Sequence, residues 1–177
     1  MKLPKKILTK RLLLRPPCIQ DAEEIYNKYA RDIKVLKYLS FKPHGSIKAT
    51  RLFLKQVIRN NRTGRSLTRA IVDRESKEYM GMIGAVIDGF KAEVSFVMAG
   101  PYQNKGYMTE ALKALIEIIF RNRSMYRVWG TCDVNNEASA KVMIKCGMRY
   151  EGIFKRWFVN PNISKKPRDD KIFSVTR

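Results

Sequence analysis

The sequence has little of the chemistry that metal sites and disulfide frameworks need. Its 177 residues include a single histidine, His44, and three cysteines, Cys18, Cys132 and Cys146. An odd cysteine count without short ligand spacings excludes a zinc set and a fully paired disulfide framework, so we expect no metal and three reduced thiols. Reduced thiols are typical of a cytoplasmic protein, and this is the location that we expect.

Long apolar runs are also missing. No stretch approaches the ~20 apolar residues that a membrane-spanning helix needs. Prolines and charges interrupt the N-terminal stretch MKLPKKILTKRLLLRPP, which does not fit a secretory signal. The sequence therefore predicts a protein that is neither secreted nor embedded in a membrane.

Acidic residues are scarce relative to basic ones. The chain has 36 Lys and Arg against 16 Asp and Glu, which gives a formal net charge of +20. A field of this sign attracts phosphates, nucleic acid, ribosomes or anionic cofactors. A basic surface that is simply solvated would have the same composition.

Two phosphate-binding signatures are absent, and the chain shows no sign of a second domain. Neither the loop GxxxxGK[ST] nor the dinucleotide fingerprint GxGxxG occurs. We find no internal repeat or low-complexity segment, and 45% hydrophobic residues are enough to build a core. We therefore expect a single domain over residues 1–177.

Hydrophobic periodicity predicts an alternation of strands and helices. A strand at 11–15 stops at two prolines, and helical spacing follows at 18–30. A second helix begins after Ser46, a good N-cap residue, and ends by Gly64. The remaining expected elements are strands at 67–73, 79–88 and 92–99, a helix at 107–121, a strand at 126–134, a helix from Asn136 to Gly147, and strands at 150–159 and 171–176.

The junction between the strand at 92–99 and the helix at 107–121 carries the segment QNKGYM, residues 103–108. The first turn of a helix has N–H groups without intrahelical partners, and the positive end of the helix dipole lies there. Gly106 lets a ligand approach the backbone, and Lys105 adds positive charge. The segment therefore predicts an anion site suited to a diphosphate, although a purely structural glycine turn is the plainer interpretation.

Four stretches, in order and spacing, resemble the GNAT superfamily of N-acetyltransferases. The family's [Q/R]xxGx[G/A] turn is similar to PYQNKGYMTEAL, which follows AEVSFVMA. The branch that includes ribosomal-protein N-terminal (Rim-type) and spermidine acetyltransferases has an opening, a third strand and an NxAS helix similar to RLLLRPP with DAEEIY, YMGMIGAVID and NNEASAKVMIKCGMRYEG. The resemblance covers the chain from about residue 8 to residue 177.

The resemblance implies an α+β fold in three α/β/α layers. Its sheet would be mixed but mostly antiparallel, with six or seven strands, would splay apart after the fourth strand, and would have about four flanking helices. The resemblance also implies acetyl-CoA as co-substrate. The expected contacts are Phe96, Val97 and Met98 with the pantetheine arm through their backbone, the amides of Gln103, Asn104, Lys105, Gly106, Tyr107, Met108 and Thr109 with the pyrophosphate, and Asn136 near the pantetheine arm.

In this family an amine attacks the thioester directly, so the resemblance implies a base, an oxyanion donor and a proton source for the thiolate. It assigns Glu93 as the base and a backbone N–H near Met98 as the oxyanion donor, whereas a solvent-facing or lysine-paired Glu93 is the alternative. The family's usual tyrosine acid is missing, because Met143 stands at its position. Ser139 is the hydroxyl that could replace it, unless its role is structural.

Two further residues raise specific questions. Met108 stands where the family usually has Gly or Ala, so its side chain either points away from the cofactor or narrows the pyrophosphate site. His44 precedes a glycine and a helix, and we expect a loop residue that lines the acceptor entrance rather than a catalytic base.

Acceptor specificity in the superfamily lies in two segments, here about residues 30–50 and the loop NPNISKKPRDD. Both are basic, which disfavours polyamines and aminoglycosides and suits a protein N-terminus presented on a ribosome. We therefore expect a ribosomal-protein N-terminus as acceptor, as for ribosomal-protein-alanine acetyltransferases. A small amine or an amino acid is the alternative acceptor.

A different class of function is also compatible with the charge. A basic domain with Trp129 and Trp157 could bind RNA or ribosomes as an acetyl-CoA-binding scaffold of weak activity. Its aromatics stand at apolar strand positions, which predicts core residues rather than a stacking platform. The expected assembly is a monomer or a homodimer, without a membrane partner.

Overall fold

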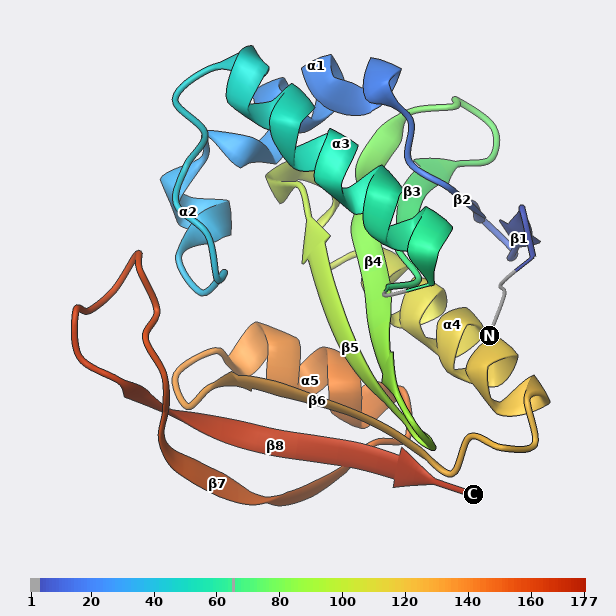
Figure 1. Cartoon of the computed structure of the whole chain (residues 1–177), viewed down its shortest axis with the longest axis vertical. Helices are drawn as coiled ribbons and strands as arrows, with labels where there is room; N and C mark the ends of the chain where they lie inside the picture. The colour runs from blue at the N-terminus through green and yellow to red at the C-terminus, as the bar shows by residue number, and fades with distance from the viewer. Residues whose placement is uncertain (1–3, 65) are drawn as a thin grey trace.

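The computed structural model describes residues 4–64 and 66–177 and is built around one eight-stranded sheet (Figure 1). The strands lie in the order β1-β2-β3-β4-β5-β6-β8-β7, and every neighbouring pair is antiparallel except β5 and β6. The strands are β1 Ile7–Leu8, β2 Leu12–Arg15, β3 Arg69–Asp73, β4 Tyr79–Asp88, β5 Lys91–Met98, β6 Arg127–Asp133, β7 Arg149–Phe158 and β8 Arg168–Thr176.

The helices are α1 Ala22–Ile25, α2 Ile33–Leu36, α3 Ile47–Thr63, α4 Tyr107–Arg121 and α5 Glu137–Lys145. Ser46 caps α3 as predicted, since its hydroxyl accepts from the Ala49 N–H at 3.3 Å. Gly64 ends α3 in the left-handed conformation, with φ of 74°. The helix expected at 18–30 is instead divided into a short 3₁₀ turn, α1 and a π-helical turn.

Helices cover both faces of the sheet, which explains why the central strand β4 is buried on both sides from Tyr79 to Ala85. On β3, Ile71 packs into the core formed with α4 and α5, whereas Ala70 and Val72 pack into the core formed with α1 and α3. This alternation produces the three α/β/α layers seen in Figure 1.

The sheet opens between its two parallel strands. The ladder between β5 and β6 joins Lys91–Glu93 to Arg127–Trp129 and stops there. Figure 1 shows β6 and β8 turning away from β5 beyond this point. β5 is the fourth of the strands expected from the sequence, so the predicted position of the splay is confirmed.

The predicted fold class is confirmed, and the strand count is corrected from six or seven to eight. The additional strand is β1, Ile7–Leu8, whose two residues pair with β2 but are too few to show a period in the sequence. A single domain over residues 1–177 stays a prediction, and residues 1–3 and 65 lie outside the described part.

The prediction that the aromatics are core residues is wrong for Trp157. It lies on β7, at the edge of the sheet, and is 52% exposed. Other apolar side chains of this strand are exposed too. Trp129 is half-buried on β6. Separately, none of the helices described here is long and apolar enough to cross a membrane.

Candidate active site

A cavity of about 600 Å³ lies where β5 and β6 diverge. Both halves of the sheet line it, together with the start of α4, the start of α5 and the segment around α2. With the exception of Lys105, every site residue expected from the sequence lines this cavity: Glu93, Phe96, Val97, Met98, Gln103, Asn104, Gly106, Tyr107, Met108, Thr109, Asn136 and Ser139.

The unpaired edge of β5 offers backbone groups to this cavity. Alternate residues of an antiparallel strand direct their N–H and C=O groups to opposite edges. The Ala99 N–H donates to the Met80 carbonyl on β4 at 2.9 Å, so Ala99 and Val97 face β4, while Phe96 and Met98 face the gap. The backbone pairing expected for residues 96–98 is therefore available at Phe96 and Met98. Val97 also lines the cavity, although its backbone groups face β4.

Gln103 has a role that the sequence did not indicate. Its side-chain Nε2 donates to the Met98 carbonyl at 2.8 Å, which fastens the turn after β5 to the end of that strand. The carbonyl of Met98 is thereby satisfied, whereas its N–H still faces the gap. That N–H is the donor expected for the oxyanion.

The turn before α4 has the geometry of an anion site. Asn104 and Gly106 have positive φ angles of 60° and 78°, and α4 begins at Tyr107 with Gly106 as its N-cap. Within the described chain no side chain caps this helix end. The N–H groups of the first turn are therefore available to a ligand at the positive end of the helix dipole.

The side chain of Met108 does not fill the anion site. Its side chain is 7% exposed and belongs to the core that α4 and α5 form with the sheet, beside Ala111 and Leu112. Because residues on α4 one position apart point in different directions, Tyr107 and Thr109 are more accessible than Met108. The larger side chain is thus accommodated by core packing.

Arg11, directly before β2, braces the turn before α4. The sequence did not indicate this role of Arg11. Its guanidinium donates to the Lys105 carbonyl at 3.1 Å and to the Glu110 carboxylate at 2.7 Å, and lies 4.2 Å from the centre of the Tyr107 ring. Glu110 also accepts from the Thr9 hydroxyl and the Arg11 N–H. These residues are about a hundred positions apart, so no local pattern could reveal the contact.

Hydrogen bonding controls the ionisation of Glu110. Partial burial opposes the charged form, but the donors on Thr9 and Arg11 outweigh it and lower the pKa of Glu110. Glu110 is therefore a carboxylate at neutral pH, and the brace carries a full ion pair.

Two lysines on α5 also line the cavity without having been predicted. Lys141 and Lys145 are exposed and four residues apart, so they share one face of the helix. Their charge makes them candidates for the phosphates of a large anionic ligand.

Glu93 lies on β5 at the last pair that joins β5 to β6. Its side chain is exposed to the cavity, and among the described residues no hydrogen bond or ion pair engages its carboxylate. Partial desolvation raises the pKa of Glu93, which makes it a better proton acceptor than a fully hydrated carboxylate.

The start of α5 brings two polar side chains, Asn136 and Ser139, to the cavity. The Asn136 side chain accepts from the Ser139 N–H at 3.2 Å and so caps the helix, which leaves its amide NH₂ to face a ligand. Ser139 lies beside Cys132 of β6, a buried residue that also lines the cavity. Burial raises the pKa of the Cys132 thiol to about 12, so this cysteine stays protonated and is a poor nucleophile.

The far wall of the cavity carries buried carboxylates. Asp133 is paired with Arg168, whose Nε and Nη2 donate at 2.5 Å and 3.1 Å. Asp170, the partner of Asp133 in the sheet, is 8% exposed, and desolvation raises its pKa. The cavity therefore has a second acidic group besides Glu93, without a cation of its own in the described chain.

One side chain outside the cavity lining links the segment around α2 to the loop between β7 and β8. Asn162, in the loop between β7 and β8, donates through its amide to the carbonyls of Leu36, Leu39 and Phe41 at 2.8, 3.2 and 2.8 Å. The loop itself is held by Asn160, which is buried and accepts from the Asn162 N–H at 3.0 Å. Two segments that are far apart in sequence thus form one continuous rim.

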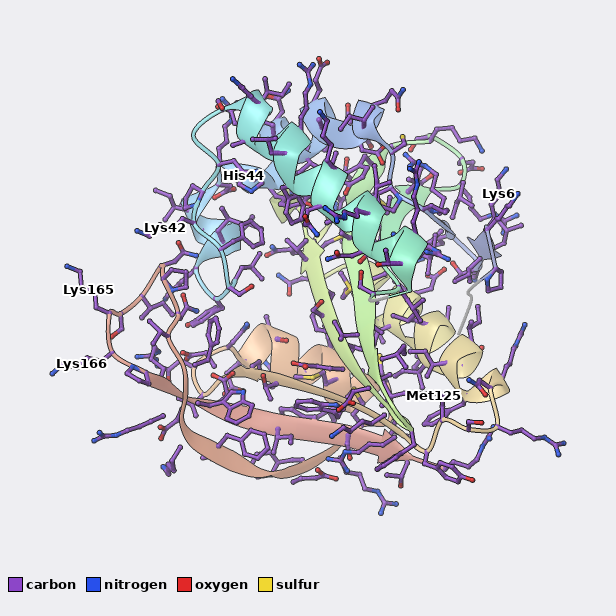
Figure 2. All side chains as sticks on the ribbon, in the orientation of Figure 1. Lys6, Lys42, His44, Met125, Lys165 and Lys166 are labelled. Carbon is purple, nitrogen blue, oxygen red and sulfur yellow. The ribbon has the colours of Figure 1, made fainter. Side chains whose placement is uncertain are left out.

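The expectation that His44 lines the acceptor entrance is not met. Its ring lies 5.5 Å from the rings of both Phe41 and Phe53, and Nδ1 is 2.9 Å from the Thr50 hydroxyl. It is absent from the lining of the cavity, and burial lowers its pKa. The ring is packed in the layer of α3, and Figure 2 shows it above the rim. Among the described residues there is no cluster of three potential metal ligands.

The sequence matches the family described as "Acetyltransferase (GNAT) domain" over residues 11–149. The uncharacterized N-acetyltransferase YnaD of Bacillus subtilis is 33% identical over 152 residues, which cover 85% of this chain and 86% of that protein.

Two solved structures share the fold. The Microcin C7 self immunity acetyltransferase MccE, in complex with acetyl-CoA and AMP, superposes with a TM-score of 0.88 at 22% identity and covers 98% of this chain and 97% of its own. The Salmonella typhimurium acetyl transferase that modifies the N-terminal serine of 50S ribosomal subunit protein L7/L12 has a TM-score of 0.84 at 18% identity, with 96% of each chain covered. From the family match and the relative together, the chain belongs to the GNAT family of N-acetyltransferases.

Proposed function

We propose that this protein transfers the acetyl group of acetyl-CoA to the primary amine of a protein N-terminus, such as that of a ribosomal protein. The observation that carries the proposal is the union, in one cavity, of an unpaired strand edge with a helix N-terminus that has no side-chain cap. A pantetheine arm can pair with such an edge as an added strand, and a pyrophosphate can bind such a helix end.

The residues divide into a cofactor half and a reaction half. Phe96 and Met98 offer backbone groups to the pantetheine arm, residues 103–109 offer amides to the pyrophosphate, and Asn136 offers its side-chain amide near the arm. Lys105 adds charge at the turn, although it does not line the cavity. The +20 charge of the chain suits a co-substrate that carries several phosphates.

When bound, acetyl-CoA supplies the thioester carbonyl and the departing thiolate. Glu93 accepts the proton that the ammonium must lose before its nitrogen can attack, directly or through one water. The Met98 N–H stabilises the negative charge that develops on the carbonyl oxygen. The Ser139 hydroxyl donates a hydrogen bond to the sulfur, and the thiolate needs little further help near neutral pH.

Two comparisons support this assignment. MccE holds acetyl-CoA on the same fold, and the Salmonella acetyl transferase modifies an N-terminal serine.

The test is CoA release from acetyl-CoA in the presence of Ala- and Ser-starting ribosomal peptides, small amines and amino acids. We expect turnover that depends on a peptide with a free N-terminus and that is absent from the N-formylated peptide. Turnover with small amines or amino acids alone would assign the protein to small-molecule acetylation instead.

A second class of function is favoured by two aromatics of β7, the half-buried Phe154 and the exposed Trp157. Phe154 and Trp157 lie 4.6 Å apart by ring centroids, next to Lys155 and Arg156, an arrangement that can stack and attract RNA. In that case acetyl-CoA would raise the melting temperature while no peptide or amine was acetylated, and RNA would bind with a strong salt dependence.

A further inference from the structure

The rim of the cavity is made of two segments that Asn162 ties together, residues 33–43 and 159–167, which we call the collar. The three hydrogen bonds from Asn162 to the carbonyls of 36, 39 and 41 join the collar into one structure. Residues of both segments line the cavity, among them Lys34, Tyr38 and Asn160. These collar residues thus line the same cavity as Glu93.

The collar has only positive side-chain charges. Its two segments contain Lys34, Lys37, Lys42, Lys165 and Lys166 and no Asp or Glu. All five lysines are exposed, and in the described chain none of them belongs to an ion pair. Figure 2 shows Lys42, Lys165 and Lys166 on the same side of the molecule.

The interior of the cavity holds two carboxylates on the strands, besides the two lysines on α5. Glu93 and Asp170 line it, and neither carboxylate has a cationic partner within the described residues. Arg168, the nearest basic side chain of β8, is committed to Asp133 at 2.5 Å. Lys141 and Lys145 lie on α5, the side assigned to the phosphates, so between the strand carboxylates Glu93 and Asp170 and the collar the charge changes from negative to positive.

This polarity orients a molecule whose two ends carry opposite charge. An ammonium is attracted inward to Glu93 and Asp170, while negative groups that remain at the entrance are attracted by the collar. A polyamine would be repelled at the collar, and a neutral chain would gain nothing there. Screening confines the effect to groups within about a Debye length, ~8 Å, of the lysines.

We propose that the acceptor is a primary amine borne on an anionic body, with its negative charges close behind the amine. This inference rests on the proposed function and adds the charge class of its substrate. The negative charge can come from acidic residues that follow a peptide N-terminus or from a phosphate on a small amine. The collar geometry itself favours the peptide, because its lysines extend along both segments.

The experiment compares three peptides that share the same first two residues and continue with Asp/Glu, with Asn/Gln or with Arg. Two further acceptors, aminoethyl phosphate and ethanolamine, represent the small phosphorylated amine and its neutral counterpart. The protein saturated with acetyl-CoA is assayed for kcat/KM at low and high salt, and binding of each acceptor to the CoA-saturated protein is measured in parallel.

We expect the acidic peptide to exceed the neutral one by roughly tenfold in kcat/KM and in affinity, through KM rather than kcat, and the advantage to shrink at high salt. The arginine peptide should be the weakest. A preference for aminoethyl phosphate over every peptide would also support an anionic acceptor and would identify its source as a phosphate.

Two charge-matched variants locate the effect. In the collar variant, Lys42→Glu, Lys165→Glu and Lys166→Glu change the charge at the entrance. In the control, Lys5→Glu, Lys6→Glu and Lys55→Glu make the same change next to β1 and on α3, and Lys6 lies on the opposite side of the molecule in Figure 2. The collar variant should lose the preference for acidic peptides, and the control should keep it.

Equal use of the three peptides, a preference for the arginine peptide, or the same loss in both variants would overturn the proposal. Charge-dependent binding of the acidic peptide without any CoA release would uphold the collar's charge selection while rejecting the proposed transfer reaction. Turnover that does not depend on peptide charge would uphold the proposed transfer reaction and reject charge selection by the collar.

Discussion

Glu93 is the residue on which the chemistry depends most. It is the carboxylate of β5 at the last pair before β5 and β6 diverge, its pKa is raised by partial desolvation, and among the described residues it has no competing partner. These properties suit a general base, and they argue against the lysine-paired alternative.

Replacing Glu93 by Gln should lower kcat by about 10²-fold or more, since a positioned base contributes this much. The affinity for acetyl-CoA should stay the same, because the carboxylate lies away from the turn at 103–109. Activity of the wild-type protein should rise with pH as Glu93 loses its proton, over a range above its usual pKa of 4.5. Stopped-flow CoA release across pH checks both points.

The control for this measurement is Glu117→Gln. Glu117 lies on the exposed face of α4, opposite the face that packs into the core. This variant should keep full activity and the wild-type pH profile. A Glu93→Gln variant with wild-type kcat would remove this residue from the mechanism.

The family position of Met108 does not determine the direction of its side chain. The sequence showed a large side chain where Gly or Ala is usual, and the structure buries that side chain in the core. Met108→Ala should therefore destabilise the protein by ~2–5 kcal/mol through the cavity it leaves, with no gain in acetyl-CoA affinity. Denaturant unfolding and a binding titration test this pair of outcomes; tighter binding by the variant would show that Met108 obstructs the site.

At the scale of elements, the turn before α4 depends on β2. Arg11 holds the Lys105 carbonyl and the Glu110 carboxylate, so the turn is fixed by an ion pair across the fold as well as by its own backbone. The brace engages one carbonyl of the turn, while within the described chain no side chain caps the N–H groups at the start of α4.

Glu110→Ala should weaken acetyl-CoA binding by about tenfold, ~1.4 kcal/mol, and should leave turnover of acetyl-pantetheine unchanged, since that substrate has no pyrophosphate. Glu110→Asp should recover part of the affinity. An equal loss with both substrates would mean that the substitution disturbs the fold rather than the turn.

The stabilising effect of the ion pair between Arg11 and Glu110 depends on pH. The folded-state pKa of Glu110 is depressed below its usual 4.5, so the stabilising effect of the brace is complete above that value and is lost as pH falls through the lower folded-state pKa. Acetyl-CoA affinity should therefore decrease in acid, and less so in the Glu110→Ala variant.

The collar depends on an equally distant contact. Asn162→Ala removes the donor to three carbonyls around α2. We expect a higher KM for the acceptor and faster hydrogen exchange in residues 33–43, with an unchanged Kd for acetyl-CoA. Asn122→Ala, in the loop after α4, is the matched control; protection of residues 33–43 equal to wild type in Asn162→Ala would contradict the prediction.

On the scale of the whole molecule, the two halves of the sheet are joined by a short parallel ladder of three residue pairs. A ligand that fills the gap beyond it contacts both halves and binds only the folded state. Acetyl-CoA at a hundred times its Kd should therefore stabilise the protein by ~2.7 kcal/mol, seen as a rise in Tm.

Gly106→Val should abolish most of this rise. An added Cβ would meet only the Arg11 side chain, at 3.6 Å, so space is available, but φ of 78° is unfavourable for a β-branched residue. The turn must then change its backbone, and the N–H groups lose their alignment. A full ligand-induced rise in this variant would show that the phosphates bind elsewhere.

Much of the fold could be predicted from the sequence, because its signals are local. The caps Ser46 and Asn136, the terminating Gly147 and the apolar runs of the central strands mark where helices and strands begin and end. β1 and α2 escaped prediction because two and four residues are too short to show a hydrophobic period.

What the sequence alone determined is the family, the order of the elements and the turn that should bind an anion, since each of these depends on residue types at fixed spacing along the chain. The tertiary structure decided the direction in which Met108 points, the brace from Arg11 to Glu110 and the collar closed by Asn162. These contacts join residues separated by about a hundred positions, and only the folded sheet brings their side chains within hydrogen-bonding distance. The proposed charge class of the acceptor rests on the collar, which exists only where the two basic segments meet.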